Sequence, residues 1–245
     1  MLPDAITAIP GLRGGPWRYL LAASLVAFPA LLAACGGGGP GGAPTATPAV
    51  TADETQARAV ALRADDMPAG LALQSEAMTT NEQAAKDEDE AQRFQQWGRL
   101  LGYKAVYSRE VSAQQVDSDG TVSVTVVVDL FADEVGASEA FTYSASQAPT
   151  GMFGDSPFSG RVRALKTHAV TRPVFGDDGF AWQTTATALL PDSDAEVPFV
   201  ANMIVVRRGR AIERLITGAF PGSTADQEFA ALIQAMANRL KEGLP

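Results

Sequence analysis

The sequence predicts an α+β domain, in which an antiparallel β-sheet of about five to six strands is packed by N-terminal, middle and C-terminal helices. Three observations support this fold class. Residues 121–131 alternate apolar and polar positions with a period of two, as strands with one buried face do. Residues 224–241 repeat apolar positions at helical spacing. Most strand patterns are grouped between helical patterns at the two ends, which favours α+β over regularly alternating α/β.

The first 34 residues have the organisation of a secretory signal. Arg13 and Arg18 precede an uncharged apolar run at 19–34, and the only cysteine, Cys35, follows it. As a helix, this sixteen-residue run would be roughly 24 Å long, shorter than the ~30 Å hydrocarbon core of a bilayer. We therefore expect residues 1–34 to be a signal peptide.

The tetrapeptide Leu32-Ala33-Ala34-Cys35 resembles the lipobox of bacterial lipoproteins. The resemblance implies cleavage between Ala34 and Cys35 and transfer of a diacylglyceryl group to the Cys35 thiol. Two acyl chains give stable anchoring, so the chain is expected at the extracytoplasmic face of the bacterial cell membrane. The alternative is an uncleaved signal-anchor helix with an incidental cysteine, which also places the remainder outside the cytoplasm.

Residues 35–53 are expected to be the lipidated cysteine and a flexible tether rich in Gly, Pro and Thr. Such a composition buries too little apolar surface to offset the entropy of ordering. Residues 54–245 are long enough for one core and predict a single globular α+β domain.

Local patterns place the elements of this domain. Thr80 and Gln83 match a capping box, Asp133 is a helix cap, and Pro149 ends the helix that Asp133 begins. The predicted helices are 55–63, 80–100, 134–148 and 224–241, and the predicted strands are 102–109, 121–131, 160–170, 180–188, 198–207 and 211–217. The inward face of the third helix is predicted to carry Ala137, Ala140, Phe141, Ser144, Ala145 and Ala148.

The order of these pieces resembles the extracytoplasmic α+β domains of bacterial lipoproteins and kinase sensor modules, and more distantly the PsbP proteins of the photosynthetic oxygen-evolving complex. The segments that prompt the resemblance are 102–103, 126–131, 174–182 and 205–209. The resemblance implies a fold, and a fold alone does not transmit a function.

Composition excludes several classes of function. A formal charge of −9 and a pI near 4.6 argue against a nucleic-acid partner, because phosphate backbones are bound through excess Lys and Arg. One cysteine and one histidine cannot form a disulfide or a structural zinc site, so no metal or cofactor is expected. The single histidine, His168, is expected in a strand and no Gly-x-Ser-x-Gly elbow is present, which predicts no catalytic residues.

Candidate binding residues lie in and near the loop at 148–160. This Gly/Pro-rich connection carries Met152, Phe153 and Phe158, and Trp182 lies on a later strand. Adaptable loops with such side chains suit an apolar ligand or a partner. Alternatively, the loop tucks these side chains over one end of the core.

Two clusters of charged residues could likewise have either a binding role or a purely structural role. Asp177 and Asp178 are either a metal or sugar-hydroxyl site or simple turn chemistry, in which carboxylates bind backbone amides. A concentration of arginines around 207–214 is either a site for lipid headgroups or an anionic ligand, or a solvated hairpin with charged edges.

The sequence therefore predicts a membrane-anchored extracytoplasmic lipoprotein that acts as a non-catalytic sensor or accessory module, binding an unknown small ligand or an envelope protein. Two alternatives stay open. A carboxylate-dependent hydrolase of the cell envelope would bring two acids together in a cleft. A structural or assembly factor resembling PsbP-type proteins would present a flat patch.

Overall fold

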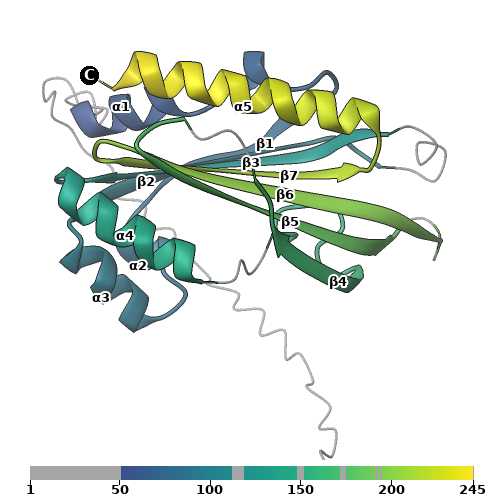
Figure 1. The fold of residues 1–245 in the computed structure, drawn as a ribbon, viewed down its shortest axis with the longest axis horizontal. Helices are drawn as coiled ribbons and strands as arrows, with labels where there is room; N and C mark the ends of the chain where they lie inside the picture. Colours follow the sequence, from purple (N-terminus) through teal and green to yellow (C-terminus); the bar gives the residue numbers. More distant parts are fainter. Residues whose placement is uncertain are drawn as a thin grey trace, which may run out of the picture. The chain divides into compact units, whose positions relative to one another are not determined.

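The computed structural model describes residues 51–111, 119–147, 152–171, 175–190, 193 and 195–244. The predicted signal peptide, Cys35 and the tether up to residue 50 lie outside these ranges, and so do residues 112–118 and 148–151. The described residues form a single antiparallel sheet with helices on both faces, which confirms the α+β class (Figure 1). The sheet has seven strands, not the five to six expected, in the order β1-β2-β3-β7-β6-β5-β4.

The elements follow one another in a simple order along the chain. They are α1 (Ala52–Val60), the short 3₁₀ helix η1 (Ala64–Asp66), β1 (Ala72–Thr79), α2 (Asn81–Ala84), α3 (Glu88–Gln96), β2 (Arg99–Ser108), β3 (Gly120–Phe131), α4 (Glu134–Ser146), β4 (Val162–Ala169), β5 (Asp178–Leu189), β6 (Glu196–Arg208), β7 (Ala211–Phe220) and α5 (Ser223–Gly243).

The additional strand is β1, which the sequence patterns did not predict. It is an edge strand whose side chains are mostly exposed, so it lacks the alternation of buried and exposed positions that marks an inner strand. It pairs with β2 alone, with an irregularity in register between Leu73 and Ser75.

The helix predicted at 80–100 is wrong as a single element. The capping box at Thr80 and Gln83 is present, but it opens only the four-residue α2. A second helix, α3, starts after Asp87, whose carboxylate accepts the Glu90 amide at 2.8 Å. Gly98, at φ +67°, then ends the helical stretch, and β2 begins at the next residue, Arg99.

The face of the sheet beneath α1 and α5 holds the largest core cluster (Figure 1). The predicted apolar stripe of the C-terminal helix is confirmed, because its five residues are all buried: Phe229, Leu232, Ile233, Met236 and Leu240. In β3, Val124, Val126, Val128 and Leu130 belong to this cluster. The alternation over 121–131 predicts Val122 on the same face as these residues, but Val122 packs in a different cluster, where the β3–β7 register shifts between Thr121 and Ser123.

The opposite face is covered by α2, α3, α4 and the loop at 152–160 (Figure 1). Asp133 caps α4 as predicted, accepting the Gly136 amide at 2.9 Å. Ala137 and Ala140 are buried against the sheet, whereas Ala145 of the predicted inward face is exposed.

A buried arginine, Arg99, forms an ion pair within the sheet and a hydrogen bond that joins α2 to this face. Arg99 on β2 donates through Nε to Asp129 on β3 at 2.8 Å and through Nη1 to Asn81 on α2 at 2.9 Å. Its Nη2 reaches Thr79 on β1 at 3.0 Å. Gly102 leaves room for this guanidinium, since a Cβ there would overlap it. The network holds α2 against the sheet, next to α3.

No helix within the described ranges combines the length and the apolarity needed to cross a bilayer.

Candidate functional site

Two of the predicted binding residues are packed into the core. Phe158 has no exposed surface and meets Phe199 and Phe220 edge-on, with ring centroids 4.8 and 5.8 Å away. Met152 is buried, and its sulfur accepts the Thr184 hydroxyl at 3.2 Å. Neither side chain is accessible to a ligand, so the loop tucks them over the sheet.

Phe153 and Trp182 are half-buried rather than enclosed. The ring centroids of Phe153 and Phe199 lie 5.9 Å apart, and Trp182 packs against the cluster that contains Met152. The structure does not gather the four predicted residues around one cavity, because Phe158 and Met152 belong to separate clusters. His168 is exposed on the edge strand β4, as expected of a strand residue.

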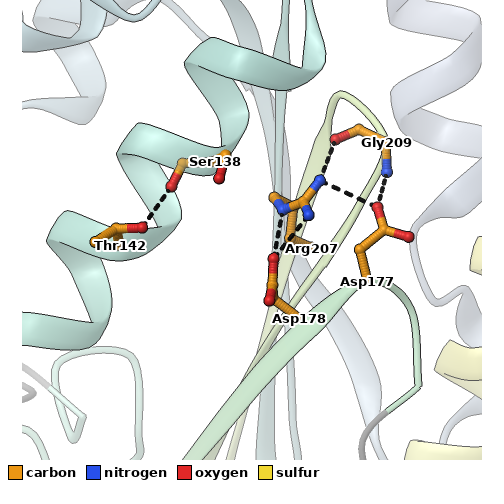
Figure 2. A network of polar contacts seen from close by, with 6 residues as sticks. All are labelled: Ser138, Thr142, Asp177, Asp178, Arg207 and Gly209. Atoms are coloured by element: carbon orange, nitrogen blue, oxygen red, sulfur yellow. Dashed lines mark hydrogen bonds and ion pairs between the residues drawn. The ribbon is translucent and has the colours of Figure 1, made fainter.

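The acidic pair at the start of β5 closes a polar network with the hairpin between β6 and β7 (Figure 2). Arg207 donates through Nε and Nη2 to the same oxygen of Asp178 at 2.9 and 2.7 Å. Its Nη1 reaches Asp177 at 3.0 Å, and Asp177 also accepts the Gly209 amide at 2.7 Å. Arg207 pairs with both carboxylates, and Asp177 also binds a backbone amide, so the network is a structural clamp built on turn chemistry.

Two other arginines of the hairpin, Arg208 and Arg210, line a small cavity, and Arg210 also forms hydrogen bonds within the protein. Arg210 binds Asp53 at 2.6 Å, the Gln56 side chain, and the Phe131 carbonyl at 3.1 Å. Arg208 lines a cavity of about 270 Å³, together with Gln56, Asp133, Glu134, Gly209, Arg210 and Leu244. Because its wall carries two carboxylates and two guanidinium groups, this cavity has no net preference for an anion.

A second hollow, an open groove of about 470 Å³, lies on α3 and α4. Its lining combines two aromatic rings, three aliphatic hydroxyl groups, the phenolic hydroxyl of tyrosine and one carboxylate, from Trp97, Ser138, Glu139, Thr142, Tyr143 and Ser146. Five of these residues come from the face of α4 that points away from the sheet, and Trp97 is the residue that ends α3. We take this α3–α4 groove as the candidate functional site.

The aromatic part of the α3–α4 groove is held from several sides. The Trp97 and Tyr143 rings lie 5.3 Å apart at 47°, and Phe94 meets Trp97 at 6.2 Å. The Arg93 guanidinium stacks 4.9 Å from the Tyr143 ring centre, a cation–π contact. These contacts restrict both rings before any ligand arrives.

The hydroxyl groups of the groove mainly offer acceptors. Thr142 donates its proton to the Ser138 carbonyl at 2.8 Å (Figure 2), and Ser146 donates to the Tyr143 carbonyl at 2.7 Å. Each of these two oxygens keeps acceptor capacity once its proton is used inside the helix, and the Ser146 oxygen already accepts the Gln147 side-chain amide at 3.1 Å. With the exposed carboxylate of Glu139, the groove therefore presents a row of acceptors beside its rings.

Close packing of two turns brings α3 and α4 together. A side chain at Gly136 would overlap the Trp97 carbonyl oxygen, so only glycine permits this approach. The Ala132 amide also donates to the Gly98 carbonyl at 2.8 Å. Sequence reasoning missed the groove because it placed Trp97 inside one long helix. The available signal was the spacing of Ser138, Thr142 and Ser146 along the outer face of α4.

A buried carboxyl lies on the other face of the sheet, beneath α5. Glu213 on β7 has no exposed surface, and neither carboxylate oxygen makes a hydrogen bond within the described residues. Burial raises the pKa of Glu213 well above its ordinary value. The Leu62 amide, which lies outside hydrogen-bond geometry, and the Arg239 guanidinium oppose this shift without cancelling it. Arg239 is already paired with Asp66 at 2.6 Å.

A scan against protein-family models finds no match, and a search of curated proteins also finds none. Among solved structures, the chain is similar to the extracellular domain of PknH from Mycobacterium tuberculosis, with a TM-score of 0.49 and 7% sequence identity. The alignment covers 77% of this chain and 96% of that domain.

Proposed function

We propose that this protein is a non-catalytic binding module, tethered to the extracytoplasmic face of the membrane by lipid on Cys35, and that the α3–α4 groove is its ligand site. The observation that carries the binding role is the groove itself, where Trp97 and Tyr143 adjoin a row of polar groups. Ligand sites commonly combine apolar surface with a few placed polar groups. The tether rests on the lipobox-like segment of the sequence.

The non-catalytic role is supported by the carboxylates of the groove. A glycoside hydrolase of the usual kind needs two carboxyl groups roughly 5 to 9.5 Å apart across the bond that it cleaves. Among the described residues, Glu139 is the only carboxylate that lines the α3–α4 groove. We therefore favour binding over hydrolysis at this site.

Replacing Cys35 with serine tests the anchor. A serine hydroxyl does not take the place of the thiol that lipidation of this segment requires, so we expect incorporation of radiolabelled palmitate to be lost. The measurement is labelling of cells that express the full chain, followed by separation of membrane and soluble fractions. Ser24→Ala, in the same apolar run, is the control and should leave labelling unchanged. Undiminished labelling of Cys35→Ser would refute acylation at this residue.

Binding at the α3–α4 groove is tested with the full chain in detergent micelles and a dialysed extract of polar cell-envelope material. We expect the extract to change the fluorescence of Trp97, because a ligand would lie against this ring. The change should disappear in Trp97→Phe and shrink in Glu139→Gln. Glu242→Gln, which removes an exposed carboxylate from α5, is the matched control. An extract that leaves the emission of the unaltered chain unchanged contradicts the proposed site.

A further inference from the structure

We propose that the ligand of the α3–α4 groove is a segment of a neutral polysaccharide chain. This inference rests on the proposed binding function and specifies the chemical class of the ligand. It follows from three properties of the described residues: the half-buried aromatic pair, the row of acceptors along α4, and the charge around the groove.

The aromatic pair suits the faces of sugar rings. A pyranose ring carries C–H groups on its faces, and these pack against the negative face of an aromatic ring. Trp97 and Tyr143 are each partly exposed, and their ring centroids lie 5.3 Å apart with the ring planes tilted by 47°, so the groove offers two adjacent aromatic rings. Arg93 and Phe94 support the rings, which limits the conformational entropy lost on binding.

The polar row on α4 suits the hydroxyl groups of sugars. Ser138, Thr142 and Ser146 recur every four residues, about 6 Å apart along the helix axis and about 12 Å from the first to the last. Thr142 already donates to a carbonyl oxygen of its own helix, so its oxygen is best used by a donor on a ligand. Ser146 donates in the same way and accepts the Gln147 side-chain amide at 3.1 Å, so its oxygen keeps one further acceptor position. A donor-rich chain that crosses several turns meets this requirement better than a single small molecule does.

The charge around the groove disfavours anionic ligands. Glu139 projects from its lining, and α3 begins with three acidic residues against a single arginine, Arg93. That arginine lies over the Tyr143 ring. Phosphate-bearing and nucleic-acid ligands would therefore meet net repulsion. A neutral glycan escapes this repulsion and still supplies hydroxyl donors to Glu139.

The experiment titrates the full chain in detergent micelles with cellohexaose and with hexa-N-acetylchitohexaose, following Trp97 fluorescence and heat of binding. We expect saturable binding to at least one of the two hexasaccharides. Thr142→Val keeps the shape of the side chain and removes its hydroxyl, so affinity should fall about 3- to 10-fold, the effect of one neutral hydrogen bond. Trp97→Ala should abolish binding.

Thr55→Val is the matched control. Thr55 is exposed on α1 and donates to the Thr51 carbonyl at 3.0 Å, the same backbone contact that Thr142 makes on α4. This control variant should bind like the unaltered chain. Melting curves of all variants establish that they are folded, and Glu139→Gln provides a second groove variant at an exposed position.

The outcomes separate this inference from the proposed function. If envelope extract changes Trp97 fluorescence but neither hexasaccharide binds, the glycan inference fails and the binding role stands. A salt-dependent response to a lysine-rich decapeptide in place of the sugars would overturn it in favour of a peptide partner. Shortened sugars after incubation would show hydrolysis and overturn the non-catalytic role. No response to the extract or to either sugar would overturn both proposals.

Discussion

Replacing Glu213 with methionine should raise the free energy of unfolding at pH 8 by about 1–3 kcal/mol, the usual cost of a buried polar group without a partner. Glu213 is fully buried on β7 beneath α5, and its two oxygens accept no hydrogen bond within the described residues. Methionine is unbranched and adapts to an irregular space. Urea unfolding of the full chain in detergent micelles measures the change. A loss of stability would show that the carboxyl is held by a contact that methionine cannot replace.

The same variant should change how stability depends on pH. Because burial raises the pKa of Glu213 in the folded state, the folded protein keeps a proton that the unfolded chain releases. Its contribution to stability is therefore fully present below the unfolded pKa of about 4.3, and it is lost as pH rises through the folded pKa. We expect this loss in the unaltered protein and its absence in Glu213→Met and Glu213→Gln.

The charged groups that act on Glu213 are Asp66 and Arg239. Asp66 and Arg239 form their own ion pair, and burial raises the pKa of Tyr103 and of Tyr107 above its ordinary value. Glu242→Gln, on the exposed side of α5, is the control and should keep the pH dependence of the unaltered protein. Parallel pH curves for Glu213→Met and the control would contradict the assignment to Glu213.

Replacing Phe158 with alanine should lower the free energy of unfolding by about 3–5 kcal/mol, as expected for a large side chain removed from a close-packed site. Phe158 is fully buried and its ring contacts Phe199 on β6 and Phe220 on β7. Urea unfolding measures the loss. Leu165→Ala, on an edge-strand residue that is 56% exposed, is the control and should change stability by less than about 1 kcal/mol. A similarly small effect of Phe158→Ala would contradict its role in the core and favour a role in ligand binding.

The two possible roles of the 148–160 loop show what sequence reasoning can and cannot decide. A Gly/Pro-rich connection with Met152, Phe153 and Phe158 is compatible both with a binding loop and with a loop that covers the core. The partners that decide between these roles for Phe158 lie on β6 and β7, more than forty residues further along the chain. No local pattern contains that information.

The sequence predictions that the structure confirms are those whose physical cause acts between residues close together in the chain. The stripe on α5 and the alternation in β3 reflect the repeat lengths of a helix and a strand, so their spacing predicts which residues share a face of the element. The Asp133 cap is also local, since its carboxylate meets an amide three residues away. The bulge that redirects Val122 and the exposed edge strand β1 depend on strand pairing, and the sequence patterns missed both.

The sequence by itself determined where the helical and strand periodicities lie, and it carries the lipobox-like segment that predicts an anchor at Cys35. Only the tertiary structure decided that Trp97, at the end of one helix, meets the outer face of another, and that the buried Glu213 carboxylate makes no hydrogen bond within the part of the chain that the structure describes. The physical reason is that periodicity and capping act within a few residues. Convergence of distant side chains depends instead on long-range packing, here on Gly136 fitting against the Trp97 backbone.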